Sequence, residues 1–197
     1  MTTPEDVLTF WFGEPGAPPR ANAEKWWKKD DAFDREIRER FEEALERGVR
    51  GELSGWESTP RGRLALVVLY DQLSRNMFRG TPRSFAQDAL ALAVATRALE
   101  VGDARALTPT EVSFLLMPLM HAEDLALQER CVRQLTSMRD EAADDELRAA
   151  LDGSVKFAGM HRAIIERFGR FPHRNAILGR PSNDEEIEFL KQPGSSF

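Results

Sequence analysis

The dipeptide Thr-Pro recurs along the chain, at Thr3-Pro4, Thr59-Pro60, Thr81-Pro82 and Thr108-Pro109. A threonine hydroxyl accepts hydrogen bonds from the free backbone amides at a helix start, and proline fits the first helical position, where its missing amide hydrogen is not needed. Each dipeptide therefore predicts a helix start. The spacing of Thr108 and Glu111, and that of Ser182 and Glu185, adds the reciprocal hydrogen bonds of a capping box.

Apolar residues follow a helical period between these starts, as in Phe33, Ile37, Phe41 and Leu45, and no segment alternates as a strand does. The pattern predicts an all-α protein with helices over 4–12, 31–47, 60–78, 82–101, 109–138, 145–168 and 183–191. Gly48 and Gly102 are the expected C-terminal caps, and Pro118 is expected to kink or divide the fifth helix. Helices of this length joined by short turns predict stacked antiparallel pairs, in either an irregular bundle or a solenoid.

Length and composition predict one domain. The 197 residues are 42% hydrophobic and 30% charged, which is enough for one core over residues 1–197, with a short flexible tail from about residue 193. Cys131 is the only cysteine, so an intrachain disulfide is excluded and a reducing compartment is favoured. The acidic N-terminus does not resemble an export signal, and the longest apolar run, Leu64 to Tyr70, is too short to span a bilayer. We therefore expect a soluble cytoplasmic protein, and the net charge of −6 disfavours binding to nucleic acid.

The helix that begins at Pro60 is apolar around most of its circumference, so its charged residues need partners. Asp71, Arg75 and Arg79 follow one another at intervals of four, which places one carboxylate beside one or two guanidiniums. This arrangement is typical of a buried ion pair that joins two helices, and also of an anion-binding site. Both interpretations remain open from the sequence.

The segment from His161 to Arg180 concentrates five arginines against one acidic residue. Gly169, Pro172 and Gly179 predict that much of it is ordered turn, which allows side chains to converge. Guanidiniums gathered in an acidic protein favour recognition of phosphate or carboxylate. The alternative is that each arginine caps a helix or pairs with a surface acid.

Two histidines have contrasting sequence environments. His161 shares a helical face with Ala158, Ile165 and Phe168, so it is predicted to be buried, as a neutral core imidazole or as a general base. His121 is expected to share a face with Asp124 and Gln128, whereas Glu123 points elsewhere. This spacing is poor for a metal, and the sequence lacks phosphate-binding, dinucleotide-binding and common hydrolase motifs. We therefore expect neither a metal nor a cofactor.

Four ordered motifs resemble those of the bacterial family known as domain of unknown function 924. They are Phe10-Trp11-Phe12-Gly13, the segment from Asp71 to Gly80, Pro118-Leu119-Met120-His121-Ala122-Glu123, and the segment from Arg167 to Asn175. The resemblance runs from about Val7 to Leu190. It implies a helical fold similar to tetratricopeptide-like proteins and brings no activity, cofactor or substrate with it.

The motifs coincide with the charged segments and suggest one polar cluster, made of Asp71, Arg75, Asn76, His121, His161, Arg170, His173 and Arg174. The leading hypothesis is a binding protein whose pocket holds an anionic small molecule, or a carboxylate or phosphate on a peptide or protein partner. Its ligand-binding residues would be Arg75, Asn76, Arg79, His121, Arg170, Arg174 and Asn175.

Two other functions are compatible with the same residues. An enzyme would use His161 or His173 as general base and Asp71 or Glu123 to orient it, while arginines stabilise developing negative charge. A protein-interaction scaffold would use the polar motifs for structure alone. The sequence does not predict the oligomeric state.

Overall fold

Helices and turns make up the part of the chain that the computed structural model describes, residues 1–17 and 20–196, and no strand occurs in it. The predicted all-α class is therefore confirmed. In chain order the elements are α1 (Pro4–Phe12), α2 (Ala23–Trp27), α3 (Asp31–Val49), η1 (Ser54–Ser58), α4 (Pro60–Val67), η2 (Val68–Leu73), α5 (Ser74–Met77), η3 (Pro82–Phe85), α6 (Asp88–Glu100), η4 (Asp103–Ala106), α7 (Pro109–Leu115), α8 (Met117–His121), α9 (Leu125–Asp140), α10 (Asp145–Phe168), η5 (Pro172–Arg174) and α11 (Asp184–Leu190).

The chain forms two compact units, one of Met1–Arg79 with Arg83–Pro118 and the other of Gly80–Pro82 with Leu119–Phe197. The expectation of a single domain with a flexible tail stays a prediction. Among the described residues, no helix combines the length and the apolar composition of a membrane span.

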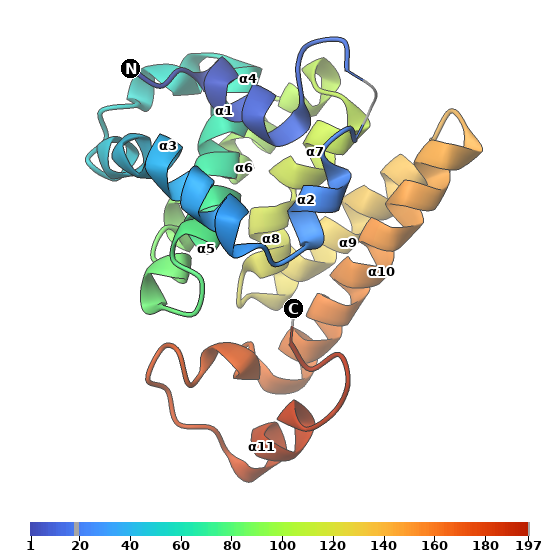
Figure 1. Ribbon diagram of the computed structural model, residues 1–197. Coiled ribbons are helices and arrows are strands. Elements are labelled where there is room, and N and C mark those ends of the chain that lie inside the picture. Colours follow the sequence, from blue (N-terminus) through green and yellow to red (C-terminus); the bar gives the residue numbers. More distant parts are fainter. Residues whose placement is uncertain (18–19, 197) are drawn as a thin grey trace. The chain divides into compact units, whose positions relative to one another are not determined.

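The first unit is built around α4 and its continuation through η2 and α5. α1, α6 and α7 pack against α4, and α3 packs against η2 and α5 (Figure 1). The residues of η2 are all buried, so this segment has no solvent-facing side. Its π-helical turn, in which hydrogen bonds span five residues, interrupts the helix that was predicted over 60–78. Polar side chains in this turn must therefore find partners inside the protein.

The predicted caps are confirmed at three of the four Thr-Pro sites. Thr3, Thr59 and Thr108 each accept a backbone amide, and Thr108 forms the expected box with Glu111. After Thr81 the prediction was wrong, because the chain makes only the short turn η3 and the helix begins later, at Asp88.

The capping box at the start of the last helix, α11, lies one residue later than predicted. Asn183 caps α11 with Glu186 as its reciprocal partner, instead of Ser182 with Glu185. The Ser182 hydroxyl instead accepts a hydrogen bond of 3.0 Å from Asn175 Nδ2.

Gly48 is not a helix end. α3 continues past it to Val49, and Gly48 is buried against the ring of Tyr70. A Cβ atom at this position would lie 2.6 Å from Tyr70 Oη, so the glycine is needed for close packing and not for capping. Gly102, by contrast, follows α6 with a φ of +85°, as expected of a residue beyond a helix end.

Two other boundaries differ from the prediction. The helix expected over 109–138 is divided into α7, α8 and α9, with Pro118 in the second position of α8 and Asp124 capping α9. α2 was not predicted, because five residues are too few to show a helical period.

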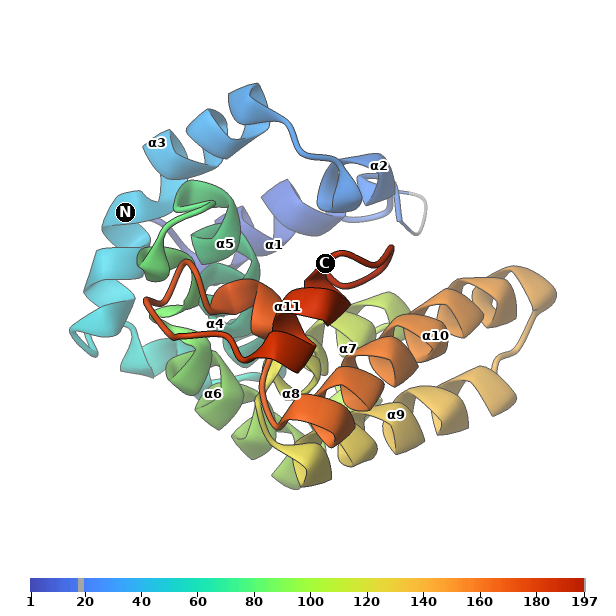
Figure 2. The same ribbon diagram turned by 90° about the horizontal axis from the view of Figure 1, so that it is seen from below.

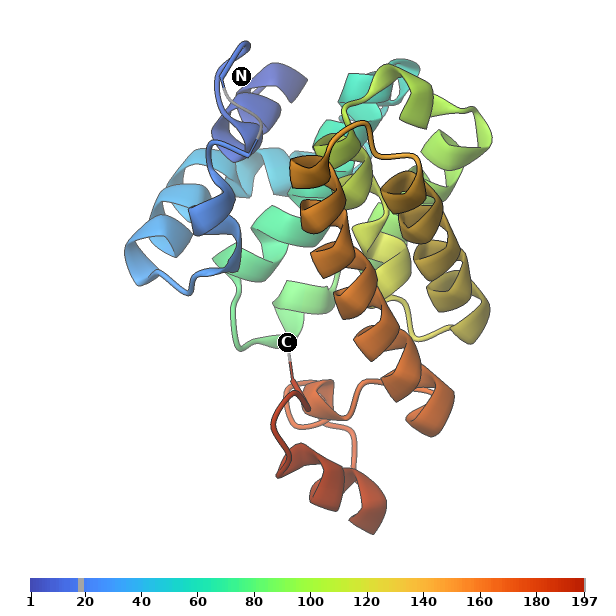
Figure 3. The same cartoon turned by 90° about the vertical axis from the view of Figure 1, so that its right-hand side faces the viewer.

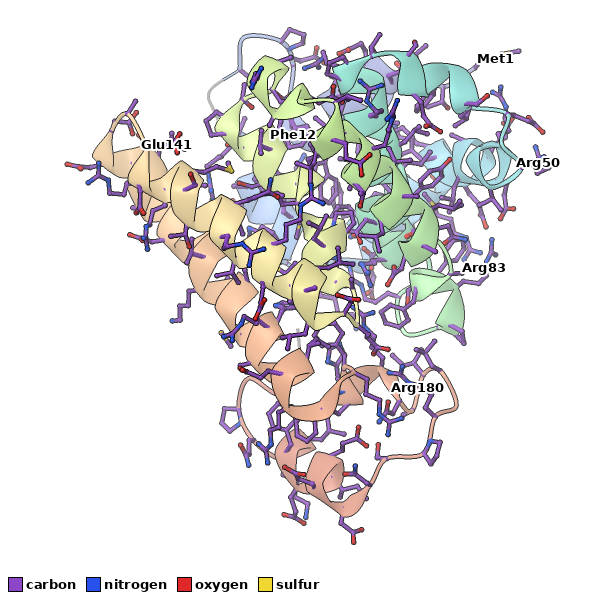
Figure 4. The ribbon with its side chains drawn as sticks, turned by 180° about the vertical axis from the view of Figure 1, so that it is seen from behind. Met1, Phe12, Arg50, Arg83, Glu141 and Arg180 are labelled. Atoms are coloured by element: carbon purple, nitrogen blue, oxygen red, sulfur yellow. The ribbon has the colours of Figure 1, made fainter. Side chains whose placement is uncertain are left out.

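The second unit contains α9 and α10, which form an antiparallel hairpin (Figure 2, Figure 3). Glu141 lies at the turn of this hairpin (Figure 4). α10 ends at Gly169, whose φ of +67° is a left-handed cap, and the chain then turns through η5 to α11. The turn-rich segment predicted after His161 therefore begins at this glycine.

Replacing Gly48 with alanine is expected to lower the free energy of unfolding by about 1–3 kcal/mol, because the new methyl group overlaps the Tyr70 ring. Gly159 of α10 is the matched control, since a Cβ there meets nothing within 4 Å. Gly159→Ala should instead stabilise the protein by roughly 0.5–1 kcal/mol. Urea unfolding of both variants measures the difference, and stabilisation by Gly48→Ala would contradict the packing described here.

Candidate functional site

A buried ion pair lies at the centre of the first unit. Asp71 belongs to η2 and has no exposed surface. Arg75 Nη2 lies 3.2 Å from Asp71 Oδ1 and 2.8 Å from an oxygen of Asp88, at the start of α6. The predicted contact between Asp71 and Arg75 is present, with a second carboxylate from a neighbouring helix. This geometry matches the structural interpretation, in which the pair joins α5 to α6.

Arg79 does not extend this pair, although it continues the spacing of four. α5 ends at Met77, so Arg79 leaves the helical line and binds Asp34 of α3 through two hydrogen bonds of 2.7 and 3.0 Å. Asn76 donates to the same carboxylate at 2.8 Å. Both side chains therefore attach α5 and the residues after it to α3.

In the second unit, His161 and His173 lie beside the buried ring of Phe171, and His121 lies beside His161. The centroid of the His161 ring lies 5.6 Å from that of Phe171 and 6.0 Å from that of His121, and His173 lies 5.6 Å from Phe171. The Arg174 guanidinium lies over the Phe171 ring, 4.5 Å from its centroid. We refer to these five residues, His121, His161, Phe171, His173 and Arg174, as the histidine centre.

His161 is held in one tautomer. Its Nδ1 atom lies 2.8 Å from the carbonyl oxygen of Phe157, and a carbonyl only accepts, so Nδ1 carries the hydrogen. Burial, together with the nearby charge of His121 and Arg174, lowers the pKa of His161 to about 3. The imidazole is therefore neutral at physiological pH, and its Nε2 atom is a hydrogen-bond acceptor.

Glu123 is engaged by groups other than a histidine. It accepts the backbone amide of Phe171 at 2.8 Å and two hydrogen bonds from Arg180, at 2.6 and 2.9 Å. Burial alone would raise the pKa of Glu123, but the bonds from Arg180 and Phe171 outweigh it and lower the pKa. Arg180, labelled in Figure 4, also donates to Asn175 Oδ1 at 3.0 Å. The prediction missed its role, although it ends the arginine-rich segment.

Arg170 and Asn175 fasten the last helix of the second unit. Arg170 donates two hydrogen bonds to Glu186 of α11, at 2.7 and 2.8 Å, and a third to the carbonyl of Pro181. Asn175 is buried and donates to Ser182. These contacts agree with the alternative in which arginines of this segment pair with acidic residues and have a structural role.

The predicted site residues thus fall into separate groups within the units. His121, His161, His173 and Arg174 lie together, whereas Arg170 and Asn175 hold α11. His121 does not share one helix with Asp124 and Gln128, because α8 ends at His121 and α9 begins at Leu125. The sequence suggested a single polar cluster that joins Asp71, Arg75 and Asn76 to the histidines. Its members belong to both units, so this cluster stays a prediction. In the part of the chain that the structure describes, no three His, Cys, Asp or Glu side chains are arranged as metal ligands.

Comparison with known proteins identifies the family. The model of the family described as bacterial protein of unknown function (DUF924) matches residues 7–194. The chain belongs to the DUF924 family. It is also similar to the solved structure of a protein of unknown function from Agrobacterium tumefaciens, with 36% identity, a TM-score of 0.81, and coverage of 95% of this chain and 96% of that one. No curated protein matches.

Replacing Asp71 with alanine in this DUF924 protein is expected to lower the free energy of unfolding by about 3–5 kcal/mol, because the buried Arg75 loses a partner. Glu36, which pairs with Arg40 on the surface of α3, is the matched control, and Glu36→Ala should cost less than about 1 kcal/mol. Chemical denaturation measures both values. Equal small losses would show that the Asp71 pair does not stabilise the first unit.

His161 should make stability depend on pH. Its pKa is about 3 in the folded protein and 6.5 when unperturbed, so below pH 6.5 only the unfolded chain takes up this proton and the free energy of unfolding falls. Between pH 7 and pH 5, His161→Gln should lose roughly 2 kcal/mol less than the parent protein. Urea unfolding at the two pH values tests this, and identical losses in parent and variant would contradict the assignment.

Proposed function

We propose that the protein binds an anionic small molecule, or a carboxylate or phosphate group on a partner, at the histidine centre. The observation that carries the proposal is that the Arg174 guanidinium and the imidazoles of His161 and His173 lie against Phe171, with His121 beside His161. A guanidinium offers paired donors in a planar fork, which suits carboxylate and phosphate oxygens. His121 and His173 are only half-buried, so part of each side chain is accessible to a ligand.

The other arginines that the sequence suggested as ligand-binding residues are less suited to binding an anion. Arg79 and Arg170 each donate two hydrogen bonds to a single carboxylate, and Arg75 lies between two carboxylates. An anion would have to displace those acids. The proposal rests instead on the grouping of Arg174, His121, His161 and His173 beside Phe171.

His161 contributes no charge of its own to this binding. Its imidazole is neutral, and its Nδ1 hydrogen is donated to the carbonyl of Phe157. The guanidinium of Arg174 would therefore supply the fixed positive charge that attracts an anion.

The catalytic alternative is weaker at His161 than at His173. A general base works best when its pKa lies near the working pH, and an imidazole with a pKa of about 3 is too weak. Glu123 is already bound by Arg180 and Phe171, so it is poorly placed to orient a base. An enzyme would have to use His173.

We also propose a cytoplasmic location and a tetratricopeptide-like arrangement. The location is supported by the single cysteine, whose pKa burial raises to about 12, so that it is held as a thiol. The antiparallel pair of α9 and α10 is the kind of unit that such folds stack.

Thermal unfolding with a panel of phosphorylated and carboxylated hydroxy acids tests the binding proposal. A ligand at one hundred times its dissociation constant stabilises the folded state by about 2.7 kcal/mol. This corresponds to a rise of roughly 5–10 °C in Tm for a chain of this size. Arg174→Ala should abolish the saturable rise.

Arg133→Ala is the matched control, because Arg133 is exposed on α9 and its ion pair with Glu129 is long, at 3.8 Å. This variant should respond to ligand as the parent does, which separates specific binding from the general stabilising effect of phosphate. Equal responses in the parent and in Arg174→Ala would favour the scaffold function, in which Arg174 is structural.

A further inference from the structure

A second candidate site lies in the first unit, far along the sequence from the histidine centre. It is a pocket of about 240 Å³ between the end of α3, η1, α4 and α6. Its walls are largely apolar and include Leu53, Leu66 and Val94, which are buried. Val49 and Leu90 also line it and are partly exposed, at 45% and 40%, so they mark its mouth.

Two polar side chains line this pocket without a hydrogen-bond partner among the described residues. Tyr70 is buried, with a residual exposure of 5%. Its hydroxyl lies against Gly48, which also lines the pocket. Glu57 belongs to η1 and is exposed, and its carboxylate makes no ion pair within the described chain. The Tyr70 hydroxyl belongs to the wall of the pocket, so a molecule in the pocket can form a hydrogen bond with it.

The position of Tyr70 is fixed by costly features of the backbone. It lies in the π-helical turn η2, a type of turn that often occurs at functional sites. It also depends on a glycine inside α3, where glycine is less stable than alanine. Both features direct the ring of Tyr70 to the pocket.

We propose that this pocket binds a small organic cation, namely an amine with one ring-sized apolar group and a short chain. The Glu57 carboxylate would attract the ammonium group, the Tyr70 hydroxyl would accept one of its hydrogens, and the apolar walls would hold the ring. A cavity of about 150 Å³ holds a benzene ring, so the larger volume here leaves room for two or three further atoms.

The charge state of Tyr70 is consistent with this role. Burial, aided by the charge of Glu57, raises the pKa of Tyr70 to about 12. The hydroxyl is therefore protonated at physiological pH, and Glu57 supplies the negative charge. The pocket does not involve the histidine centre, so either proposal can fail without the other.

Tyr70 is the only tyrosine of the chain, which allows a direct test. Protein labelled with ring-¹³C tyrosine gives the NMR signals of this one ring. Titration with 2-phenylethylamine is expected to shift them in a saturable way. The same titration with 3-phenylpropionate, which has a similar shape and the opposite charge, should leave them in place.

Glu57→Gln removes the charge at the mouth of the pocket and should weaken amine binding by up to about fivefold, the upper end of the range of an exposed ion pair. Glu39→Gln removes the same charge from the exposed face of α3 and should bind as the parent does. Absence of a saturable shift with the amine overturns the proposal. Equal shifts with amine and carboxylate, or equal affinities of the parent and Glu57→Gln, overturn it as well.

Discussion

Complete burial of the segment from Leu64 to Ser74 is the constraint on which the first unit depends. A helix surrounded by α1, α3, α6 and α7 has no side on which to expose a polar group. Asp71 therefore has Arg75 beside it, and Arg75 takes a second carboxylate from α6. The π-helical turn at this point also directs Tyr70 towards α3. One local departure from α-helical geometry thus organises both the ion pair and the pocket.

The second unit is held together at the end of its long hairpin by carboxylates that each bind several groups. Glu123 receives the amide of Phe171 and the guanidinium of Arg180, and Glu186 receives Arg170 while it caps α11. These contacts fix the turns on both sides of Phe171. His173 and Arg174, which lie in the turn η5 directly after Phe171, are positioned as a result.

Local signals in the sequence were reliable where they depend on neighbouring residues. The capping threonines, the end of α10 at Gly169 and the burial of His161 all follow from short-range chemistry or a helical period. Gly48 was misassigned because a glycine needed for packing resembles a capping glycine in sequence. The partners of Arg79 and Arg170, Asp34 and Glu186, could not be predicted, because ion pairs between elements leave no local pattern.

The sequence by itself determined the helical class, most helix starts, the family and the segments in which polar residues concentrate. These properties follow from hydrogen bonds and periodicities that span a few residues. Only the tertiary structure decided which arginines bind carboxylates, that His161 and His173 lie beside one phenylalanine, and that Tyr70 lines a pocket with Glu57. Such contacts join residues that are far apart in the chain, and packing alone brings them within reach of one another.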